Sequence, residues 1–243
     1  AMSIDPGNDN LAWDFAAGLT VIGLDNEVLA LTRILGDRAL LMLRAHVGQY
    51  AEMLAGDNLD MNPPFWRGRM FLGLVLANVG DFERAQPHLE ELWNEICDRK
   101  VTTAACYTPT ITALVFARRA AGQDASEIIE AIRDDVRRQK EAGITLTGRD
   151  ESRDFAEGLA ENLDGNRKAA LALMNKAVED GYYVNVGEHY LQPLFDDPGF
   201  APILAIQEAR QARETAKFLE VVCNDNPYAD VWEPLPETCA VYK

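Results

Sequence analysis

Residues 70–92 read MFLGLVLANVGDFERAQPHLEEL and place small and apolar residues where two antiparallel helices must touch closely. Gly73 removes a side chain where the second helix crosses, and Gly80 permits a left-handed turn. Asp81 can cap the next helix, and Ala85 lets that helix approach. The second helix then shows an apolar face at helical spacing: Phe82, Leu89 and Leu92. The stretch predicts a helix hairpin, either a repeated unit or one amphipathic hairpin in an all-α domain.

A second copy of this pattern favours the repeat. Aligning Gly165 with Gly80 places equivalent residues at the positions of Gly73, Ala85, Leu89 and Leu92, namely Gly158, Ala170, Met174 and Ala177. Between the two copies, residues 113–122 and 126–143 predict a third hairpin. Gly122 keeps its turn, but Glu127 stands where the small residue belongs. The three turn glycines are 42 and 43 residues apart, so we expect an all-α chain of successive hairpins.

This pattern resembles the tetratricopeptide (TPR) repeat. A standard TPR unit has about 34 residues, so the wider spacing implies an extended helix or loop in each copy, at residues 98–108 and 144–150. The resemblance implies a right-handed solenoid, in which stacked hairpins bury each other's apolar faces and leave a concave surface for a partner.

The C-terminal part carries a resemblance of its own. Residues 175–182 (NKAVEDGY) and 191–200 (LQPLFDDPGF) are similar to the end of bacterial TPR arrays in class III adenylate cyclases and winged-helix transcriptional regulators. The tail around residues 222–239 is similar to tails of the cyclase group. Neither a cyclase catalytic domain nor a winged helix is recognisable in the 243 residues. The resemblance therefore implies a sensor or interaction module separate from such an output domain.

We divide the chain into three parts. Residues 1–10 are interpreted as a cloning scar and flexible leader, and residues 11–204 as TPR-like helical repeats that begin with helices at 25–35, 37–55 and 65–79. Residues 205–243 are expected to form a capping helix and an extended tail anchored by Trp232, or a tail that occludes the groove. The expected buried stripe of the capping helix is Ile206, Ala209, Ala212, Ala216, Leu219 and Val222.

Charge argues against nucleic acid as a direct partner. The chain has 39 acidic and 23 basic residues, a net charge of −16 and a pI near 4.6, whereas phosphate binding requires a basic face. The acidic surface favours solubility or a basic peptide partner. An uninterrupted apolar run of about 18 residues is missing, so we expect no membrane insertion by this segment.

The sequence predicts no catalytic, metal or cofactor site. His46, His88 and His189 lie on separate expected elements without ligand spacing around them. The carboxylates of Asp196 and Asp197 suit a divalent cation, but the following Pro-Gly pair favours a turn that caps the next helix. Phosphate-binding loops, nucleophile elbows and Cys-x-x-Cys patterns are also missing from the sequence. We therefore expect a protein that is not an enzyme.

The four cysteines form two local pairs, Cys97 with Cys106 and Cys223 with Cys239. An even count in local pairs favours disulfides and hence an extracytoplasmic, periplasmic location. Free thiols in a cytoplasmic protein are the alternative.

The TPR resemblance also implies which side chains line a concave groove: Arg67, Met70, Leu74, Asn78, Thr112, Phe116, Arg119, Phe155, Leu159 and Asn162. Asparagine amides can hold a peptide backbone, and arginines can hold a carboxylate. The two-lysine pattern of carboxylate-clamp TPR proteins is missing. The leading hypothesis is a non-catalytic protein or peptide interaction module of a bacterial signalling or regulatory protein. A small-molecule sensor is the alternative, and an enzyme on a helical scaffold is a third.

Overall fold

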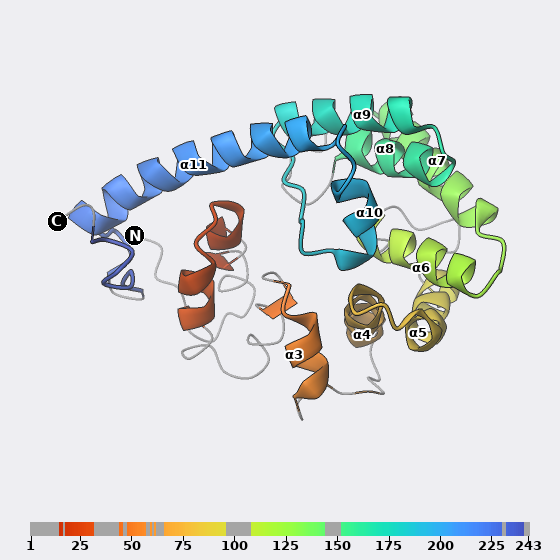
Figure 1. Ribbon diagram of the computed structural model, residues 1–243, viewed down its shortest axis with the longest axis horizontal. Helices are drawn as coiled ribbons and strands as arrows, with labels where there is room; N and C mark the ends of the chain where they lie inside the picture. Colours follow the sequence, from red (N-terminus) through yellow and green to blue (C-terminus); the bar gives the residue numbers. More distant parts are fainter. Residues whose placement is uncertain are drawn as a thin grey trace. The chain divides into compact units, whose positions relative to one another are not determined.

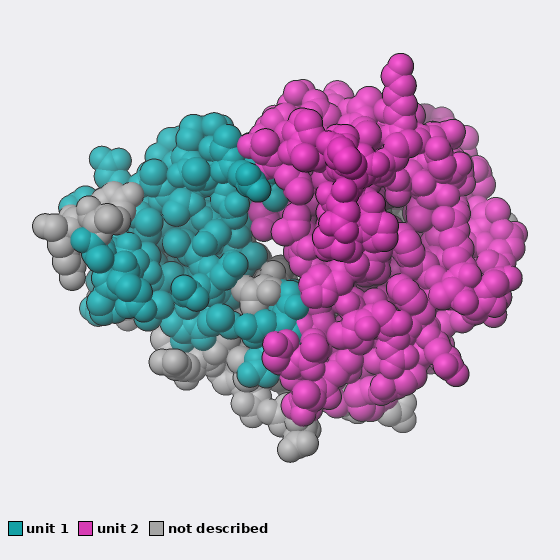
Figure 2. Space-filling view, in the orientation of Figure 1, with its two compact units in different colours: residues 1–49, 207–243 teal, residues 50–206 magenta. Residues whose placement is uncertain are grey.

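The computed structural model describes residues 15–16, 18–31, 44–45, 48–56, 59, 61, 66–95, 108–143, 152–229 and 232–240. This part of the chain is helical and contains no strand, so the expected all-α class is confirmed. It divides into two compact units, one made of residues 1–49 and 207–243 and one of residues 50–206 (Figure 2). Each unit is described by itself.

Figure 1 shows the labelled helices, and their bounds follow the hairpin pattern. They are α3 (Tyr50–Ala55), α4 (Trp66–Asn78), α5 (Phe82–Glu95), α6 (Thr108–Ala120), α7 (Ser126–Glu141), α8 (Arg153–Leu163), α9 (Arg167–Glu179), the 3-10 turn η1 (His189–Leu191), α10 (Gln192–Phe195) and α11 (Ala201–Asn224). In the unit of residues 50–206, α4 packs on α5, α5 on α6, α7 on α8 and α8 on α9. One apolar core runs through them, including Leu72, Leu89, Leu114, Ile128, Leu159, Met174 and Phe200.

The α4–α5 and α8–α9 hairpins share the same close contact. A Cβ atom on Gly73 would lie 2.7 Å from Leu89 Cδ2, and one on Gly158 would lie 2.9 Å from Met174 Cγ. Real Cβ atoms essentially never approach another heavy atom within 3.0 Å, so a side chain at either position would force its neighbour to shift. These are the residue pairs that the sequence alignment made equivalent.

The three hairpin turns are also alike. Gly80, Gly122 and Gly165 have φ of +79°, +70° and +83°, a conformation that L side chains rarely adopt. In each turn the amide of the next residue donates to a carbonyl five residues back: Asp81 to Leu76 at 2.9 Å, Gln123 to Arg118 at 2.8 Å and Asn166 to Glu161 at 2.9 Å. This is the Schellman arrangement, and it satisfies carbonyls that the helix end leaves free.

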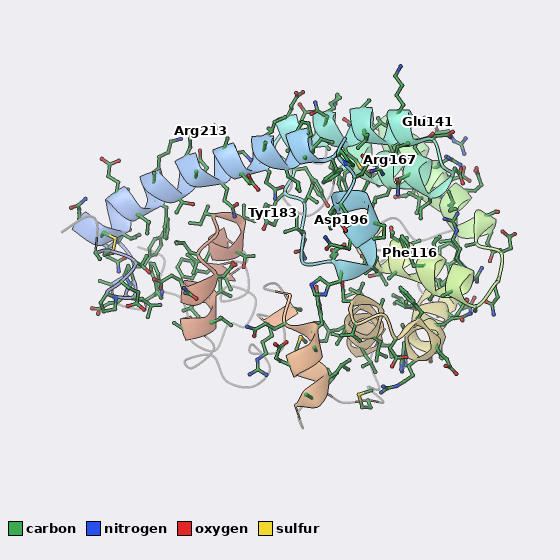
Figure 3. The ribbon with its side chains drawn as sticks, in the orientation of Figure 1. Phe116, Glu141, Arg167, Tyr183, Asp196 and Arg213 are labelled. Atoms are coloured by element: carbon green, nitrogen blue, oxygen red, sulfur yellow. A yellow bond between two sulfur atoms is a disulfide. The ribbon has the colours of Figure 1, made fainter. Side chains whose placement is uncertain are left out.

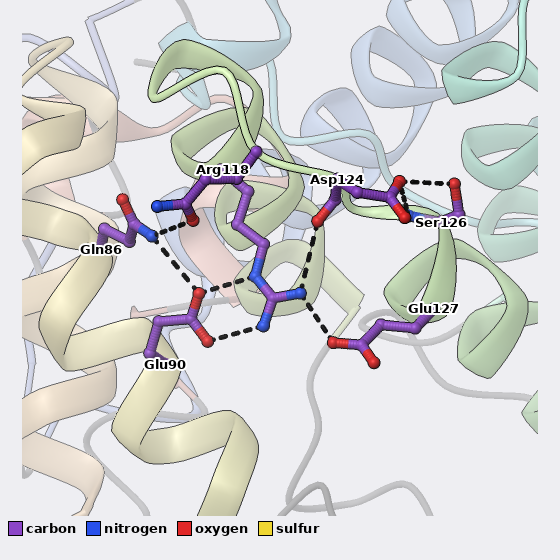
Figure 4. Close-up of polar contacts among 7 residues, drawn as sticks. Gln86, Glu90, Arg118, Asp124, Ser126 and Glu127 are labelled. Carbon is purple, nitrogen blue, oxygen red and sulfur yellow. Dashed lines mark hydrogen bonds and ion pairs between the residues drawn. The ribbon is translucent and has the colours of Figure 1, made fainter.

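In the middle hairpin, α6 and α7, ion pairs take the place of a close helix contact. Helices α6 and α7 pack less extensively than the other two pairs, and Arg118 on α6 connects three helices (Figure 4). Its Nε and Nη2 atoms donate to the two carboxylate oxygens of Glu90 on α5 at 2.6 and 2.7 Å. Its Nη1 donates to Glu127 on α7 at 2.7 Å. The hydrogen bond from Arg118 is the main cause that lowers the pKa of Glu90. Glu127, the predicted departure from the repeat, thus pairs with a cation.

The other unit is built around the second part of α11. Helical residues 18–21 and 25–31 pack against it, with a core that contains Leu19, Val28, Val222 and Trp232. Trp232 lies edge-on to Phe15 with ring centroids 5.3 Å apart, and it also contacts Phe218 at 6.0 Å.

A disulfide and a set of hydrogen bonds to Glu27 hold the C-terminal tail within this unit. A disulfide joins Cys223 to Cys239, whose Cα atoms are 5.4 Å apart. The buried Glu27 carboxylate accepts hydrogen bonds from the Leu235 amide at 2.9 Å and from the Thr238 hydroxyl. The other predicted pair, Cys97 and Cys106, lies outside the described residues, as do the expected leader and the extension at 144–150. The extension expected at 98–108 also lies outside them except for Thr108, which begins α6.

Two helix predictions were wrong in detail. The helix expected over 37–55 is interrupted, because Gly48 adopts φ of +73° and α3 begins only at Tyr50. The expected apolar stripe of α11 is also incorrect, since Ala209, Ala212 and Ala216 are exposed. The face turned toward residues 18–24 carries polar groups instead, with Thr215 donating to the Ile22 carbonyl. The alanines have the spacing of an apolar face, but they are not buried.

The glycine contacts predict matched losses of stability. We expect Gly73→Ala and Gly158→Ala each to lower the free energy of unfolding by about 1–3 kcal/mol, because the new methyl group collides with Leu89 or Met174. This loss should exceed the gain of about 1 kcal/mol in helix propensity. Gly56→Ala is the control, because its Cβ would meet ordinary contacts of 3.5 Å and more. Urea unfolding measures the change, and neutral effects at both glycines would contradict the repeat contact.

The disulfide predicts a second loss. Closing a loop of 16 residues restricts the unfolded chain, so a Cys223→Ala/Cys239→Ala variant should be less stable by about 3 kcal/mol. Thermal unfolding with and without reductant provides the measurement. Reductant should lower the melting temperature of the wild type more than that of the variant. Equal shifts would mean that this bond contributes nothing.

Candidate partner-binding face

The residues expected to line a groove lie on α4, α6 and α8, the first helix of each hairpin. Met70, Leu74, Phe116 and Asn162 are half-buried, Asn78, Thr112, Phe155 and Leu159 are buried, and Arg119 is exposed. The side chain of Arg67 lies outside the described part of the structure. A surface that faces open solvent would not bury so many of them. Part of this burial comes from the core between the helices, and part from another segment that lies on Asn78, Phe116 and Phe155.

That segment is residues 182–190, which we call the strap. It leads from the end of α9 into η1 and α10, and Figure 1 shows α10 between α4 and α6 on one side and α8 and α9 on the other. Apart from the first two residues of η1, the strap has no helical structure. A turn shapes its middle, where the Asn185 side chain accepts from the Gly187 amide at 3.0 Å.

Each of the three helices contributes one contact to the strap. The Asn78 side chain at the end of α4 accepts a hydrogen bond from the His189 amide at 2.7 Å and donates to the Leu74 carbonyl at 2.9 Å. On α6, the Phe116 ring lies 5.9 Å from the Tyr190 ring. On α8, the Phe155 ring lies 4.6 Å from the Tyr182 ring. The structure therefore brings these three predicted groove residues to one common segment.

The other two polar candidates are engaged between repeats. Arg119 Nη2 donates to the Leu163 carbonyl at 2.7 Å, which ties α6 to the end of α8. Asn162 accepts from Arg167 Nη1 at 2.6 Å, and Arg167 also pairs with Asp197 at 2.8 Å. Figure 3 labels Arg167 among the side chains near α10. These side chains hold adjacent elements together, whereas the sequence suggested a role in holding a ligand.

A buried acidic group in the strap escaped the sequence analysis. Glu188 is 9% exposed, and its Oε2 accepts a hydrogen bond from the Tyr190 hydroxyl at 2.7 Å. Burial raises the pKa of Glu188 to about 7, and the tyrosine hydrogen bond offsets this only in part. Tyr50 on α3 belongs to the same cluster, because its pKa is raised first by burial and then by the Glu188 charge. The Tyr50 ring also lies edge-on to His189 at 5.7 Å.

The remaining candidates from the sequence have structural surroundings. Asp197 accepts from the Gly199 amide at 2.7 Å, which forms the turn predicted for the Asp-Asp-Pro-Gly stretch before α11. His88 on α5 is half-buried, and burial is the first cause that lowers its pKa. His46 lies outside the described residues. Within the described ranges, no group of three or more histidine, cysteine or acidic side chains could hold a metal ion. None of the described helices is long and apolar enough to span a membrane.

No protein family, curated protein or solved structure matches this chain. The interpretation of the face formed by α4, α6 and α8 therefore depends on its own geometry.

Glu188 predicts a pH-dependent stability. A raised pKa in the folded state stabilises the fold fully below the unfolded pKa of 4.5 and loses that contribution as pH rises through about 7. Glu188→Gln cannot ionise but can still accept from Tyr190. Between pH 5 and pH 8 the variant should gain about 3 kcal/mol of stability relative to the wild type, since one pKa unit is worth about 1.4 kcal/mol.

Urea unfolding at several pH values measures this difference. Glu208→Gln on α11 removes an exposed carboxylate and serves as the control, with a small and constant effect expected. A difference between Glu188→Gln and the wild type that stays constant with pH would show that Glu188 is ionised throughout.

Proposed function

We propose that this protein is a non-catalytic interaction module of a bacterial signalling or regulatory protein. It is built from TPR-like helix hairpins and binds a protein or peptide on its inner face, by which we mean the face formed by α4, α6 and α8. The observation that carries the proposal is the pair of equivalent contacts, Gly73 on Leu89 and Gly158 on Met174. Identical close contacts at equivalent positions are the property expected of a structural repeat, and stacked repeats present one continuous surface. The similarity of residues 175–182 and 191–200 to bacterial TPR arrays supports the bacterial and regulatory assignment.

The type of contact on this face also supports peptide binding. The Asn78 amide holds a main-chain N–H group, and the Phe116 and Phe155 rings pack against aromatic side chains. A side-chain amide recognises any peptide backbone, while aromatic contacts select particular side chains. The three residues come from three successive hairpins, so an extended peptide could contact all of them.

Charge indicates which peptides are favoured. Four basic side chains of the described hairpins, Arg118, Arg133, Lys140 and Lys176, already pair with carboxylates on neighbouring elements. The chain as a whole has an excess of acidic groups, with a net charge of −16. We therefore expect partners with basic flanks, whose binding weakens as salt screens the attraction.

Selection of peptides by display tests this proposal. The intact chain, immobilised and exposed to a random peptide library, should enrich peptides with aromatic residues and basic flanks that bind with micromolar dissociation constants. Affinity should fall as salt rises from 50 to 500 mM, because the Debye length shrinks over this range from more than about 10 Å to about 4 Å. An unrelated acidic helical protein is the control. Failure to enrich any peptide over this control, both on the intact chain and on a variant whose inner face is made more accessible, would reject the proposed function.

A further inference from the structure

The strap occupies the inner face in the way a bound peptide would. Its contacts consist of one main-chain N–H held by Asn78 and two aromatic rings placed on Phe155 and Phe116, eight residues apart in the strap. None of these contacts belongs to regular helix pairing. They are the amide and aromatic contacts that extended peptides make when they bind in grooves.

The strap differs from the segment that follows it. Leu191, Leu194 and Phe195 are buried in the main core, and Phe195 packs on Phe200 with ring centroids 5.4 Å apart. Residues 191–200 are therefore a permanent part of the fold, because their removal would open the core.

Within the strap, in contrast, burial is incomplete. Val184 and Tyr190 also reach the main core, but Val186 is 45% exposed, His189 is exposed and Tyr182 is only half-buried. The strap also buries the Glu188 carboxyl, which accepts a hydrogen bond from Tyr190 and forms no ion pair with a basic side chain in the part of the chain that the structure describes. Releasing residues 182–190 would return this acid to water, and hydration of the acid offsets part of the lost apolar burial.

We propose that the strap is a built-in occupant of the inner face, which a partner peptide must displace in order to bind. The proposal rests on the proposed function and adds the chemistry of the partner. That peptide carries two aromatic side chains eight positions apart. Just before the second aromatic it has a residue other than proline, whose main-chain N–H can bond to Asn78. At the position of Glu188 it has a neutral residue. A neutral residue gives the partner an advantage over the strap, because the single hydrogen bond from Tyr190 compensates the burial of an acid only in part.

The energetic consequence is a reduced apparent affinity. Only molecules whose strap has left the inner face can bind the peptide. If they are a fraction of the population, the apparent dissociation constant equals the intrinsic constant divided by that fraction. Weakening the strap without changing the inner face should therefore tighten peptide binding.

The test uses a fluorescein-labelled peptide of residues 181–192 in which Glu188 is replaced by Gln, with binding to the full chain measured by fluorescence anisotropy. The loosened protein carries Tyr182→Ala and Tyr190→Ala, which remove the two strap rings that contact Phe155 and Phe116. Asn78, Phe116 and Phe155 themselves stay unchanged. We expect the loosened protein to bind the peptide at least about tenfold more tightly than the wild type. Val186→Ala, at an exposed strap position, is the matched control and should bind as the wild type does.

Two further variants locate the binding. Adding Asn78→Ala to the loosened protein should weaken peptide binding at least about tenfold, because the peptide N–H loses its acceptor. Asn175→Ala, which removes an amide that bonds only locally to Glu179, should have no effect. Circular dichroism checks folding, and if the double variant is unfolded, Tyr182→Ala alone replaces it because that ring is only half-buried.

A folded loosened protein that binds no more tightly than the wild type, or that is insensitive to Asn78→Ala, would overturn the proposal and make the strap a permanent structural element. The proposed function fails separately. Display on both the wild type and the loosened protein without any enriched peptide would reject the interaction module itself. If peptides bind the wild type and Asn78→Ala does not weaken their binding, they bind at a site that the strap does not occupy. That result would reject the proposal for the strap but not the proposed function.

Discussion

The helical repeats depend on the missing side chains at Gly73 and Gly158. These two positions let Leu89 and Met174 approach the opposite helix within distances that a Cβ atom would forbid. Because a helix is rigid over its whole length, its closest point of approach fixes where all its other residues face. The positions of Asn78 at the end of α4 and of Phe155 at the start of α8 follow from this contact. The strap can be held on α4 and α8 only while these two hairpins keep their spacing.

The middle hairpin shows what replaces such a contact when the small residue is lost. With Glu127 at that position, α6 and α7 rely on Arg118, which binds both oxygens of Glu90 and one of Glu127. A bidentate arginine pair fixes orientation as well as distance, and the half-buried position of Arg118 limits screening by water. The same side chain therefore joins α6 to the hairpin before it and to its own partner helix. Polar bridging takes over the positioning that apolar contact performs in the other two copies.

The sequence predicted the parts of this structure that recur. Spacing and turn glycines identified the all-α class, the three hairpins and the residue pairs that meet at Gly73 and Gly158, because each of these features repeats. It did not identify the strap, since residues 182–190 have neither helical nor strand periodicity. Asn78 was chosen as a group that could hold a partner's backbone; in the structure it accepts from the chain's own His189 amide, and its role toward a partner stays a prediction. The alanines of α11 show the opposite error: their helical spacing predicted a buried face, but the structure leaves them exposed.

Glu27 and Glu188 are buried acids among the described residues, and their hydrogen bonds compensate both only in part. The Leu235 amide and the Thr238 hydroxyl donate to the same oxygen of Glu27, Oε1, while its buried Oε2 has no partner. Glu188 accepts from the Tyr190 hydroxyl, and burial raises its pKa to about 7. The difference between the two segments is therefore covalent, because the disulfide from Cys223 to Cys239 ties the tail to α11 whatever the state of Glu27. The strap has its polar and aromatic contacts on α4, α6 and α8, and such contacts can be exchanged for those of a partner peptide.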